Sequence, residues 1–257
     1  MFREHARLWP IGRRRSRCLI SAQGWVYVPS QVEETYLESI YNLAMEEGRV
    51  RAVELAERFG VSRPTVAQTL KKLSDSGFII QDRASGVRLT PMGQRETESL
   101  LRRHRLAERL MFDVLGMDFI SAHEQAHTLE HWISPAVEER IQNLLGAPQT
   151  CPHGNPIPGN APGGLEYLRS QKAFRLSTTK PGDLVSVVCI SEVVEDESAL
   201  LRQLLDTGIV PGRELGITAR REDGSVEYRT QGKSHALSGD LTDKIWVRQA
   251  DGGETPR

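Results

Sequence analysis

The sequence has 257 residues, of which 39% are hydrophobic and 26% are charged, and its formal net charge is −1. This is the composition of a globular protein with room for two or three small domains, and no apolar run approaches the roughly 18 residues that a membrane span needs. A chain so close to neutrality binds nucleic acid only through local basic patches. The three cysteines, Cys18, Cys151 and Cys189, lie far apart, which argues against a disulfide framework and for a reducing cytoplasm.

The first 28 residues carry six arginines against one acid, Glu4, and lack the continuous apolar segment of a secretory signal. The arginines are Arg3, Arg7, Arg13, Arg14, Arg15 and Arg17. One interpretation is a basic arm that contacts DNA. The other, which we favour because Arg-rich disordered ends are common, is a disordered extension over 1–28.

Three helices and a hairpin are expected next. Apolar residues recur at helical spacing from Val32 to Glu47, and a short amphipathic helix over 51–60 stops at Gly60. Ser62 is a plausible N-cap for a third helix that reaches about Ser74. Alternating residues around a turn at 84–86 then predict two strands. This order indicates a winged helix-turn-helix domain over 29–93.

The third helix of this unit and the hairpin after it predict a DNA-binding surface. Hydrogen-bonding side chains suit base edges and phosphates in a major groove. Between Arg49 and Arg88 there are eight basic and four acidic residues, a local charge of +4. The alternative is a solvated helical hairpin in an all-α protein. The predicted contact residues are Arg51, Ser62, Arg63, Pro64, Thr65, Gln68, Thr69, Lys72, Arg83 and Arg88.

Further helices are expected over 94–146: one from about Gln94 to Leu115, one from about Ser121, and one capped by Ser134. They predict a helical dimerisation and metal-binding domain. Residues 147–172 are expected to be a linker, because 147–164 contains five prolines and four glycines. Short strands around one helix predict a small β-barrel over 173–250, and 251–257 is a tail. The fold class is therefore α+β and multidomain.

The stretch "HEQAHTLEH" over 123–131 raises the question of a metal site. His123, His127, Glu130 and His131 lie at i, i+4, i+7 and i+8, so they share one face of a helix. On the preceding helix His104 and Glu108 are again i and i+4. Convergence of these two faces would gather imidazoles and carboxylates, which suit divalent transition metals. The alternative is a solvated polar face.

A second interpretation makes the same residues catalytic. "HTLEH" over 127–131 satisfies the H-x-x-E-H signature, in which two histidines hold zinc and the glutamate is a general base. Such a zinc metallopeptidase would need a peptidase domain around the motif. The helical region has only about 55 residues, between a DNA-binding unit and a small barrel, so we do not expect an enzyme.

From about Glu33 to Arg248 the chain resembles the diphtheria-toxin-repressor family of metal-dependent transcriptional regulators. The resemblance rests on "ETYLESIYNL", "SRPTVAQTLKKL", "GVRLTPMG", "HRLAERLM", "LEH" and "GNPIPG", in this order. It implies a winged helix, dimerisation helices and a C-terminal SH3-like (FeoA-like) domain. It also implies a cytoplasmic homodimer that binds double-stranded DNA at a palindromic operator, with Mn²⁺ or Fe²⁺ as corepressor for metal-uptake genes and no membrane or small organic substrate as partner.

The resemblance also implies two metal sites, so that one or two ions bind per subunit. The ancillary site corresponds to His104, Glu108 and His123, with Glu197 from the SH3-like domain; Leu200 stands where a glutamine ligand is expected. The primary site corresponds to His127, Glu130 and His131, with side chains from the first helix.

The sulfur ligands of the iron-sensing pattern are absent from the primary site. His127 replaces a cysteine and Thr35 replaces a methionine, whereas Glu38 matches a carboxylate ligand of the manganese-sensing branch and Glu34 is a substitute for that branch's missing aspartate. Carboxylate and imidazole ligands suit the harder ions. We therefore expect a repressor that prefers Mn²⁺ over Fe²⁺. The remaining alternatives are an activator, or a winged-helix regulator that senses another signal.

Overall fold

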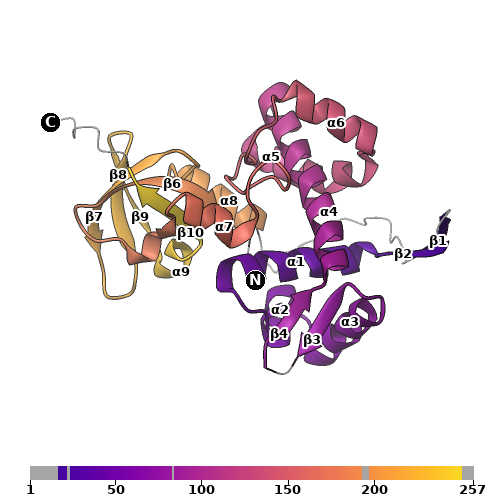
Figure 1. Ribbon diagram of the computed structural model, residues 1–257. Coiled ribbons are helices and arrows are strands. Elements are labelled where there is room, and N and C mark those ends of the chain that lie inside the picture. Colours follow the sequence, from indigo (N-terminus) through magenta and orange to yellow (C-terminus); the bar gives the residue numbers. More distant parts are fainter. Residues whose placement is uncertain (1–16, 22–23, 83, 193–196, 251–257) are drawn as a thin grey trace, which may run out of the picture. The chain divides into compact units, whose positions relative to one another are not determined.

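The computed structural model describes residues 17–21, 24–82, 84–192 and 197–250 (Figure 1). The chain forms two compact units. The first comprises residues up to Tyr41 and Arg49–Thr97, and the second comprises Asn42–Gly48 and the chain from Glu98 onward. Helix α1 (Gln31–Glu47) contributes to both units, and so does α4 (Pro91–Arg109).

The first unit has the element order expected of a winged helix. Helix α1 is followed by α2, α3 and a two-stranded antiparallel sheet, which are Ala52–Phe59, Arg63–Asp75, β3 (Ile79–Asp82) and β4 (Gly86–Leu89). The tight turn between α2 and α3 is possible because Gly60 adopts a left-handed conformation, with φ of 59°. The winged helix-turn-helix prediction is confirmed.

Helix α3 begins where the sequence indicates. The Ser62 hydroxyl oxygen accepts a hydrogen bond from the backbone N–H of Thr65 at 3.3 Å, and Pro64 occupies the first turn. Its apolar residues Val66, Leu70 and Leu73 are fully buried. Their burial fixes the helix against the unit and leaves its polar face toward solvent.

The expected disorder of 1–28 is wrong for the part that the structure describes. Residues Arg17–Ser21 (β1) pair antiparallel with Gly24–Val28 (β2). Both strands contain β-branched residues and β2 also contains aromatic ones, which favour pairing over an open coil. Residues 1–16 lie outside the described residues.

The helices of the second unit depart from the expected bounds. Helix α4 continues into a wider π-helical turn over Leu110–Val114, and α5 (Phe119–Leu129) begins two residues earlier than the sequence suggested. The reason is Asp118, whose carboxylate accepts hydrogen bonds from the N–H groups of Ile120 and Ser121 and caps the helix. Helix α6 (Pro135–Leu144) follows its Ser134 cap as predicted.

The segment after α6 is not a simple linker. Residues 151–158 are buried, and Gly154 packs so tightly that an added Cβ would lie 2.1 Å from the carbonyl oxygen of Val188. A helix, α7 (Gly164–Ser170), lies inside the predicted linker, because Tyr167 and Leu168 pack against Val188. We call residues 147–163 the strap. Its middle part, 151–158, is an interior segment held by packing.

The C-terminal part is a six-stranded antiparallel sheet with the order β5–β10–β6–β7–β8–β9. The strands are Phe174–Arg175 (β5), Leu184–Ile190 (β6), Glu214–Arg220 (β7), Val226–Thr230 (β8), Lys233–Leu237 (β9) and Ile245–Gln249 (β10). Its core includes Leu201 and Leu204 of α8 (Glu197–Asp206), and α9 (Gly239–Thr242) precedes β10. The predicted β domain is present, and β5 and β9 are additional strands.

Candidate metal centre and DNA-binding surface

The predicted DNA-contact residues of α3 form one exposed face. Thr65, Gln68, Thr69 and Lys72 lie at i, i+3, i+4 and i+7, opposite the buried apolar residues. Thr69 is partly buried, whereas the other three side chains are exposed. Ser62, Arg63 and Pro64 are also exposed at the start of the helix.

Two of the other predicted contacts can be placed in this unit. Arg88 is exposed on β4, whereas Arg51 is held by Glu54, to which its Nε atom donates at 2.6 Å. Arg51 therefore serves the start of α2, a role that the sequence did not suggest. Arg83 lies outside the described residues.

The predicted metal ligands of the second unit come together. His104 and Glu108 lie on α4, His123 and His127 on α5, and Glu130 and His131 in a short 3-10 turn (Glu130–Trp132) that follows α5. We call these six residues the helical cluster. The single helix face expected for 123–131 is therefore interrupted, because the backbone tightens at Glu130.

One histidine links the two carboxylates of the helical cluster. His104 Nδ1 lies 2.6 Å from Glu130 Oε2, and its Nε2 lies 3.2 Å from Glu108 Oε1. His123 Nδ1 lies 2.8 Å from the same Glu108 oxygen. The ring of His127 lies 4.5 Å from that of His104, and His131 Nε2 is 3.4 Å from Glu130. The two sites that the sequence separated are thus continuous.

The electrostatics of the helical cluster follow from these contacts. Burial opposes the charged form of His104, but Glu108 and Glu130 outweigh it and hold its pKa well above the ordinary value. Burial likewise opposes ionisation of Glu108, and His153 and His104 overcome it, so the pKa of Glu108 is well below its ordinary value. Desolvation and the neighbouring imidazoles lower the pKa of His127 well below normal, although part of its surface reaches solvent. The cluster is a balanced set of imidazolium, carboxylate and neutral imidazole groups.

Two residues of the strap complete a second group that the sequence did not reveal. His153 Nδ1 lies 3.1 Å from Glu108 Oε1, and Cys151 Sγ lies 3.7 Å from His153 Nδ1. We call Glu108, Cys151 and His153 the strap cluster. A cysteine and a histidine two residues apart in "CPHGNP" were the signal that could have found it.

Both clusters have the chemistry to bind a cation. Ligand atoms of His104, His123 and His127 lie within 4.8 Å of one another, and so do those of the strap cluster. Two buried atoms, Glu108 Oε2 and His153 Nε2, have no hydrogen-bond partner among the described residues. Because leaving a buried polar atom unsatisfied costs about 1–3 kcal/mol, these atoms indicate a place for a ligand. Carboxylate, imidazole and thiol groups fit a divalent transition metal.

The remaining predicted ligands lie on other elements of the chain. Glu34 and Glu38 lie one turn apart on the part of α1 that belongs to the first unit, and both are partly exposed. Glu197 begins α8, but its side chain lies outside the description. Leu200 is buried in the core of the sheet domain, so it cannot take the place of the expected glutamine ligand.

An additional acid, Glu192, lies beside this region at the end of β6. It accepts hydrogen bonds from Asn42 at 3.0 Å and from Arg105 at 2.8 Å. Burial would raise its pKa, but the Arg105 guanidinium outweighs that effect and lowers it. The fully buried Arg105 and this carboxylate connect α1, α4 and the sheet domain within the second unit.

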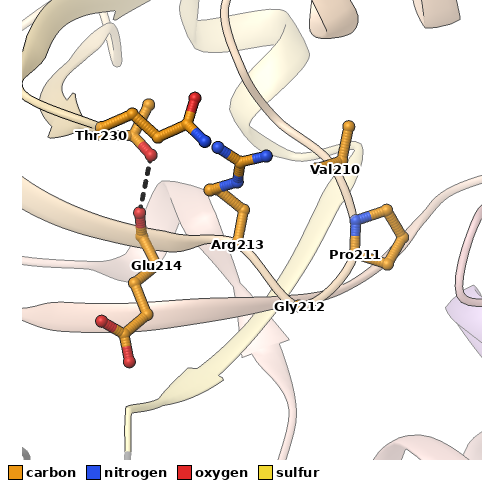
Figure 2. A pocket seen from close by; sticks show the side chains of 7 residues that line it. Val210, Pro211, Gly212, Arg213, Glu214 and Thr230 are labelled. Carbon is orange, nitrogen blue, oxygen red and sulfur yellow. Dashed lines mark hydrogen bonds between the residues drawn. The ribbon is translucent and has the colours of Figure 1, made fainter.

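The sheet domain has a pocket of about 540 Å³ between the start of β7 and the β8–β9 turn (Figure 2). In Figure 2, Arg213 extends over the pocket and the carboxylate of Glu214 points away from it. Thr230 donates to the backbone carbonyl of Glu214 at 2.9 Å and closes one side. None of the predicted site residues lines it. Among the described residues, no helix is long and apolar enough to cross a membrane.

Three family models match this chain. "Iron dependent repressor, N-terminal DNA binding domain" matches residues 30–87. "Iron dependent repressor, metal binding and dimerisation domain" matches residues 90–159, and "FeoA domain" matches residues 174–249. In chain order, the three matched ranges contain the α2–α3 motif, the two clusters and the six-stranded sheet.

Relatives and solved structures agree with these matches. The diphtheria toxin repressor of Corynebacterium diphtheriae is 33% identical over 220 residues, which are 84% of this chain and 96% of that protein. The iron-dependent repressor IdeR of Mycobacterium tuberculosis is 34% identical over 189 residues, or 72% and 82% of the two chains. A manganese-dependent transcriptional repressor in complex with manganese is 31% identical, with a TM-score of 0.69, over 85% of this chain and 100% of that one. The structure of T. acidophilum IdeR gives 27% identity and a TM-score of 0.69, over 87% and 100%. With its DNA-binding, metal-binding and FeoA domains in this order, the chain belongs to the iron-dependent, diphtheria-toxin-repressor family of transcriptional repressors.

Proposed function

We propose that this protein is a homodimeric, metal-dependent repressor, in which Mn²⁺ or Fe²⁺ bound to the helical cluster and the strap cluster controls operator binding by α3. The observation that carries the proposal is the buried group of histidines and carboxylates in the same chain as an exposed polar recognition helix. The family supports it, since relatives are named as iron-dependent and manganese-dependent repressors.

The ligand residues would bind a metal ion through their donor atoms and balance its positive charge. His104, His123 and His127 supply imidazole nitrogens, while Glu108 and Glu130 supply carboxylate oxygens. A divalent cation held there would supply the positive charge that the protonated form of His104 otherwise supplies, and His104 would give up that proton. His104 would then offer a ring nitrogen as a ligand in place of one of its contacts to Glu108 and Glu130. A ligand acts on the DNA-binding unit only if its affinity differs between two arrangements of that unit.

The first helix provides the expected link. We propose that Glu38, together with Glu34 in place of the missing aspartate, contributes a carboxylate to the metal bound by Glu130 and His131, as the sequence resemblance implies. Such a ligand would make the position of the DNA-binding unit depend on metal occupancy. The palindromic operator follows from the two-fold symmetry of a dimer.

The dimer is supported by an exposed apolar surface on the helical part of the second unit. Six large apolar residues between 112 and 144 are exposed, and Trp132 is the most exposed of them at 72%. Large apolar side chains exposed in this number on one set of helices are typical of a protein–protein interface. They are Phe112, Val114, Leu115, Trp132, Val137 and Leu144. We propose that a second copy of this chain covers them.

Manganese is the favoured ion for the helical cluster, because its ligands are imidazoles and carboxylates without sulfur. Cys151 adds one thiol to the strap cluster, which suits a softer ion. We propose up to two ions per subunit, action in the cytoplasm and control of metal-uptake genes. No catalytic role is proposed for "HTLEH", because Glu130 is engaged with His104 rather than facing a substrate pocket.

The test is operator binding by the purified full-length dimer. DNA from the protein's own promoter and from neighbouring metal-transporter genes would be titrated by fluorescence anisotropy, anaerobically, with a chelator or with Mn²⁺, Fe²⁺ or Zn²⁺. Binding that requires a metal supports the proposal. Operator binding that is equal in chelator and in metal would overturn it, and would favour a regulator of another signal. Transcription in vitro on the same DNA would then show whether the protein represses or activates the gene.

A further inference from the structure

The end of strand β6 is attached to the strap by hydrogen bonds. The N–H of Ile190 donates to the backbone carbonyl of His153 at 3.0 Å, and the Asn155 side-chain amide donates to the Ile190 carbonyl at 3.0 Å. His153 is a member of the strap cluster. Ser191 and Glu192 follow directly in the chain, so their position depends on the segment that carries two of the proposed ligands.

Glu192 joins α1 to the helix that carries the first ligands of the helical cluster. Its Oε2 atom accepts hydrogen bonds from Asn42 of α1 at 3.0 Å and from Arg105 of α4 at 2.8 Å. Arg105 is fully buried, follows the proposed ligand His104 and donates to the carbonyl of Pro156 in the strap at 2.5 Å. One carboxylate therefore links α1 with α4 and, through Arg105, with the strap.

A second buried group holds the last turn of α1. The Ser191 hydroxyl donates to the carboxylate of Glu46 at 2.8 Å, and the Arg175 guanidinium donates to the same carboxylate at 2.9 Å. The side chain of Glu46 is only 1% exposed, and Arg175 lies over the ring of Trp246 at 3.9 Å from its centroid. A buried charge is stable only where it is paired and hydrogen-bonded, so these contacts hold the end of α1 against the sheet domain.

The preceding turns of α1 pack against α2 in the first unit. The ring of Tyr36 stacks on that of Phe59, with centroids 4.4 Å apart, and Arg58 donates to the Ser39 hydroxyl at 3.2 Å. Ser39 and Asn42 are three residues apart on one continuous helix, or about 4.5 Å along its axis. A displacement of the C-terminal turns of α1 therefore also changes its contacts with the DNA-binding unit.

We infer that Ser191 and Glu192 are positioning residues that make the arrangement of α1 depend on whether the two clusters hold metal. This inference rests on the proposed metal-dependent repression. Ligation by His153 would fix the strap, and the strap fixes the end of β6, from which both residues reach α1. Neither residue supplies a metal ligand, so breaking their contacts with α1 should leave metal binding intact and weaken the response of operator binding to metal.

The experiment compares Asn42→Ala, Ser191→Ala and the double variant with the parent, all as the full-length protein. Both substitutions keep the two buried arginine–glutamate pairs described above, so the variants are expected to fold, and thermal unfolding checks this. The matched control is Ser170→Ala, whose hydroxyl donates to the Tyr167 carbonyl at 2.7 Å within α7. Operator affinity is measured by fluorescence anisotropy in chelator and in Mn²⁺. Titration calorimetry gives the Mn²⁺ affinity with and without operator DNA.

The double variant should lose coupling and keep its metal. The gain in operator affinity caused by Mn²⁺ should fall by about fivefold or more, the low end of the range for coupled sites. Because coupling is reciprocal, the gain in Mn²⁺ affinity caused by operator DNA should fall by the same factor. The Mn²⁺ affinity of the DNA-free protein should stay within about twofold of the parent's, because no ligand is removed. A role in stability alone would lower Tm and leave both gains unchanged.

Three results would overturn the inference. They are an unchanged gain in all three variants, an equal fall in the Ser170→Ala control, and weaker Mn²⁺ binding by the DNA-free variants, which would place Asn42 or Ser191 in the metal site itself. A parent whose operator binding ignores metal would remove the proposed function and this inference with it. A metal-responsive parent with fully responsive variants contradicts the inference alone.

Discussion

The helical cluster and the strap cluster share Glu108 but differ in how a metal ion reaches them. His127 of the helical cluster is exposed, and the His131 side chain is 13% exposed. In the strap cluster the side chain of Glu108 is 1% exposed, His153 is 2% exposed and Cys151 is fully buried. An ion must lose more of its hydration to enter the strap cluster.

The two clusters also differ in the protons that a metal must displace. Burial and the carboxylate of Glu108 raise the pKa of the Cys151 thiol well above normal, so the thiol is protonated before metal binds. In the helical cluster, the raised pKa of His104 means that a metal ion must displace its proton. Because metal binding competes with protons, the helical cluster should bind its ion at a lower metal concentration than the strap cluster. The affinity of the strap cluster should also increase more steeply with rising pH.

The largest effect is expected from the shared ligand. Glu108→Gln removes the carboxylate charge that contacts three imidazoles, so both clusters should lose their ion. The number of Mn²⁺ ions bound per chain, measured by equilibrium dialysis, should fall to none. In the parent this number is two, or one if the strap cluster does not bind an ion. Glu124→Gln, which breaks an exposed pair with Arg202 at 2.8 Å, is the matched control and should keep the parent's stoichiometry. A Glu108→Gln protein that is folded and still binds the full number of ions would refute the shared role.

His131→Ala tests the helical cluster alone. It should abolish metal-dependent operator binding while the dimer remains intact, because a ligand is lost and the hydrophobic surface is not. Operator anisotropy with Mn²⁺ and analytical ultracentrifugation of the same sample give the two readings. An unchanged metal response would remove His131 from the metal site.

Cys151→Ser tests the strap cluster alone. Replacing the thiol by a hydroxyl should lower the affinity for softer ions more than the affinity for Mn²⁺. The affinity for Zn²⁺ should fall on the order of tenfold or more. In Co²⁺-loaded protein, the thiolate-to-metal charge-transfer absorption should disappear. Its persistence would show that Cys151 is not a ligand.

The pKa shifts predict opposite pH dependences for the metal-free and metal-loaded protein. The pKa of His104 is raised in the fold above its ordinary 6.5, so its contribution to stability is complete below pH 6.5 and is lost as pH rises through the raised value. The pKa of Glu108 is lowered from 4.5, so its contribution is complete above pH 4.5 and is lost as pH falls through the lowered value. Thermal unfolding of the metal-free protein should therefore show Tm falling above pH 6.5. With Mn²⁺ bound, Tm should rise over that range; parallel curves would contradict the proton-for-metal exchange.

The smallest effect concerns the frame that supports the helical cluster. Asp118→Ala removes the cap of α5 and should lower the free energy of unfolding by about 1 kcal/mol. Chemical denaturation measures this loss, and Asp118→Asn should recover most of it. A loss that Asn does not recover would mean that the carboxylate charge, rather than capping, is what matters.

The exposed and helical parts of the site were predictable from the sequence, because their spacing is local. The face of α3 and the pairs His104/Glu108 and His123/His127 follow from 3.6 residues per turn. The 3-10 turn at Glu130 and the early start of α5 were not, because they depend on a cap and a local tightening rather than on periodicity.

The strap cluster was missed although Cys151 and His153 lie two residues apart, because prolines and glycines in a run indicate an exposed linker. Cys151 and His153 are buried by tertiary contacts such as that of Gly154 with Val188, which no local pattern encodes. The β1–β2 hairpin was missed for a different reason. The arginine content of 1–28 drew attention away from two short apolar runs, 18–20 and 25–28.

The most direct test of the account is a simultaneous count of bound Mn²⁺ and measurement of operator affinity on one anaerobic sample of the protein. The account predicts that operator affinity rises by at least about tenfold as the first ion per chain binds, and that the Glu108→Gln protein shows neither the ion nor the rise. High operator affinity at zero bound metal would contradict it.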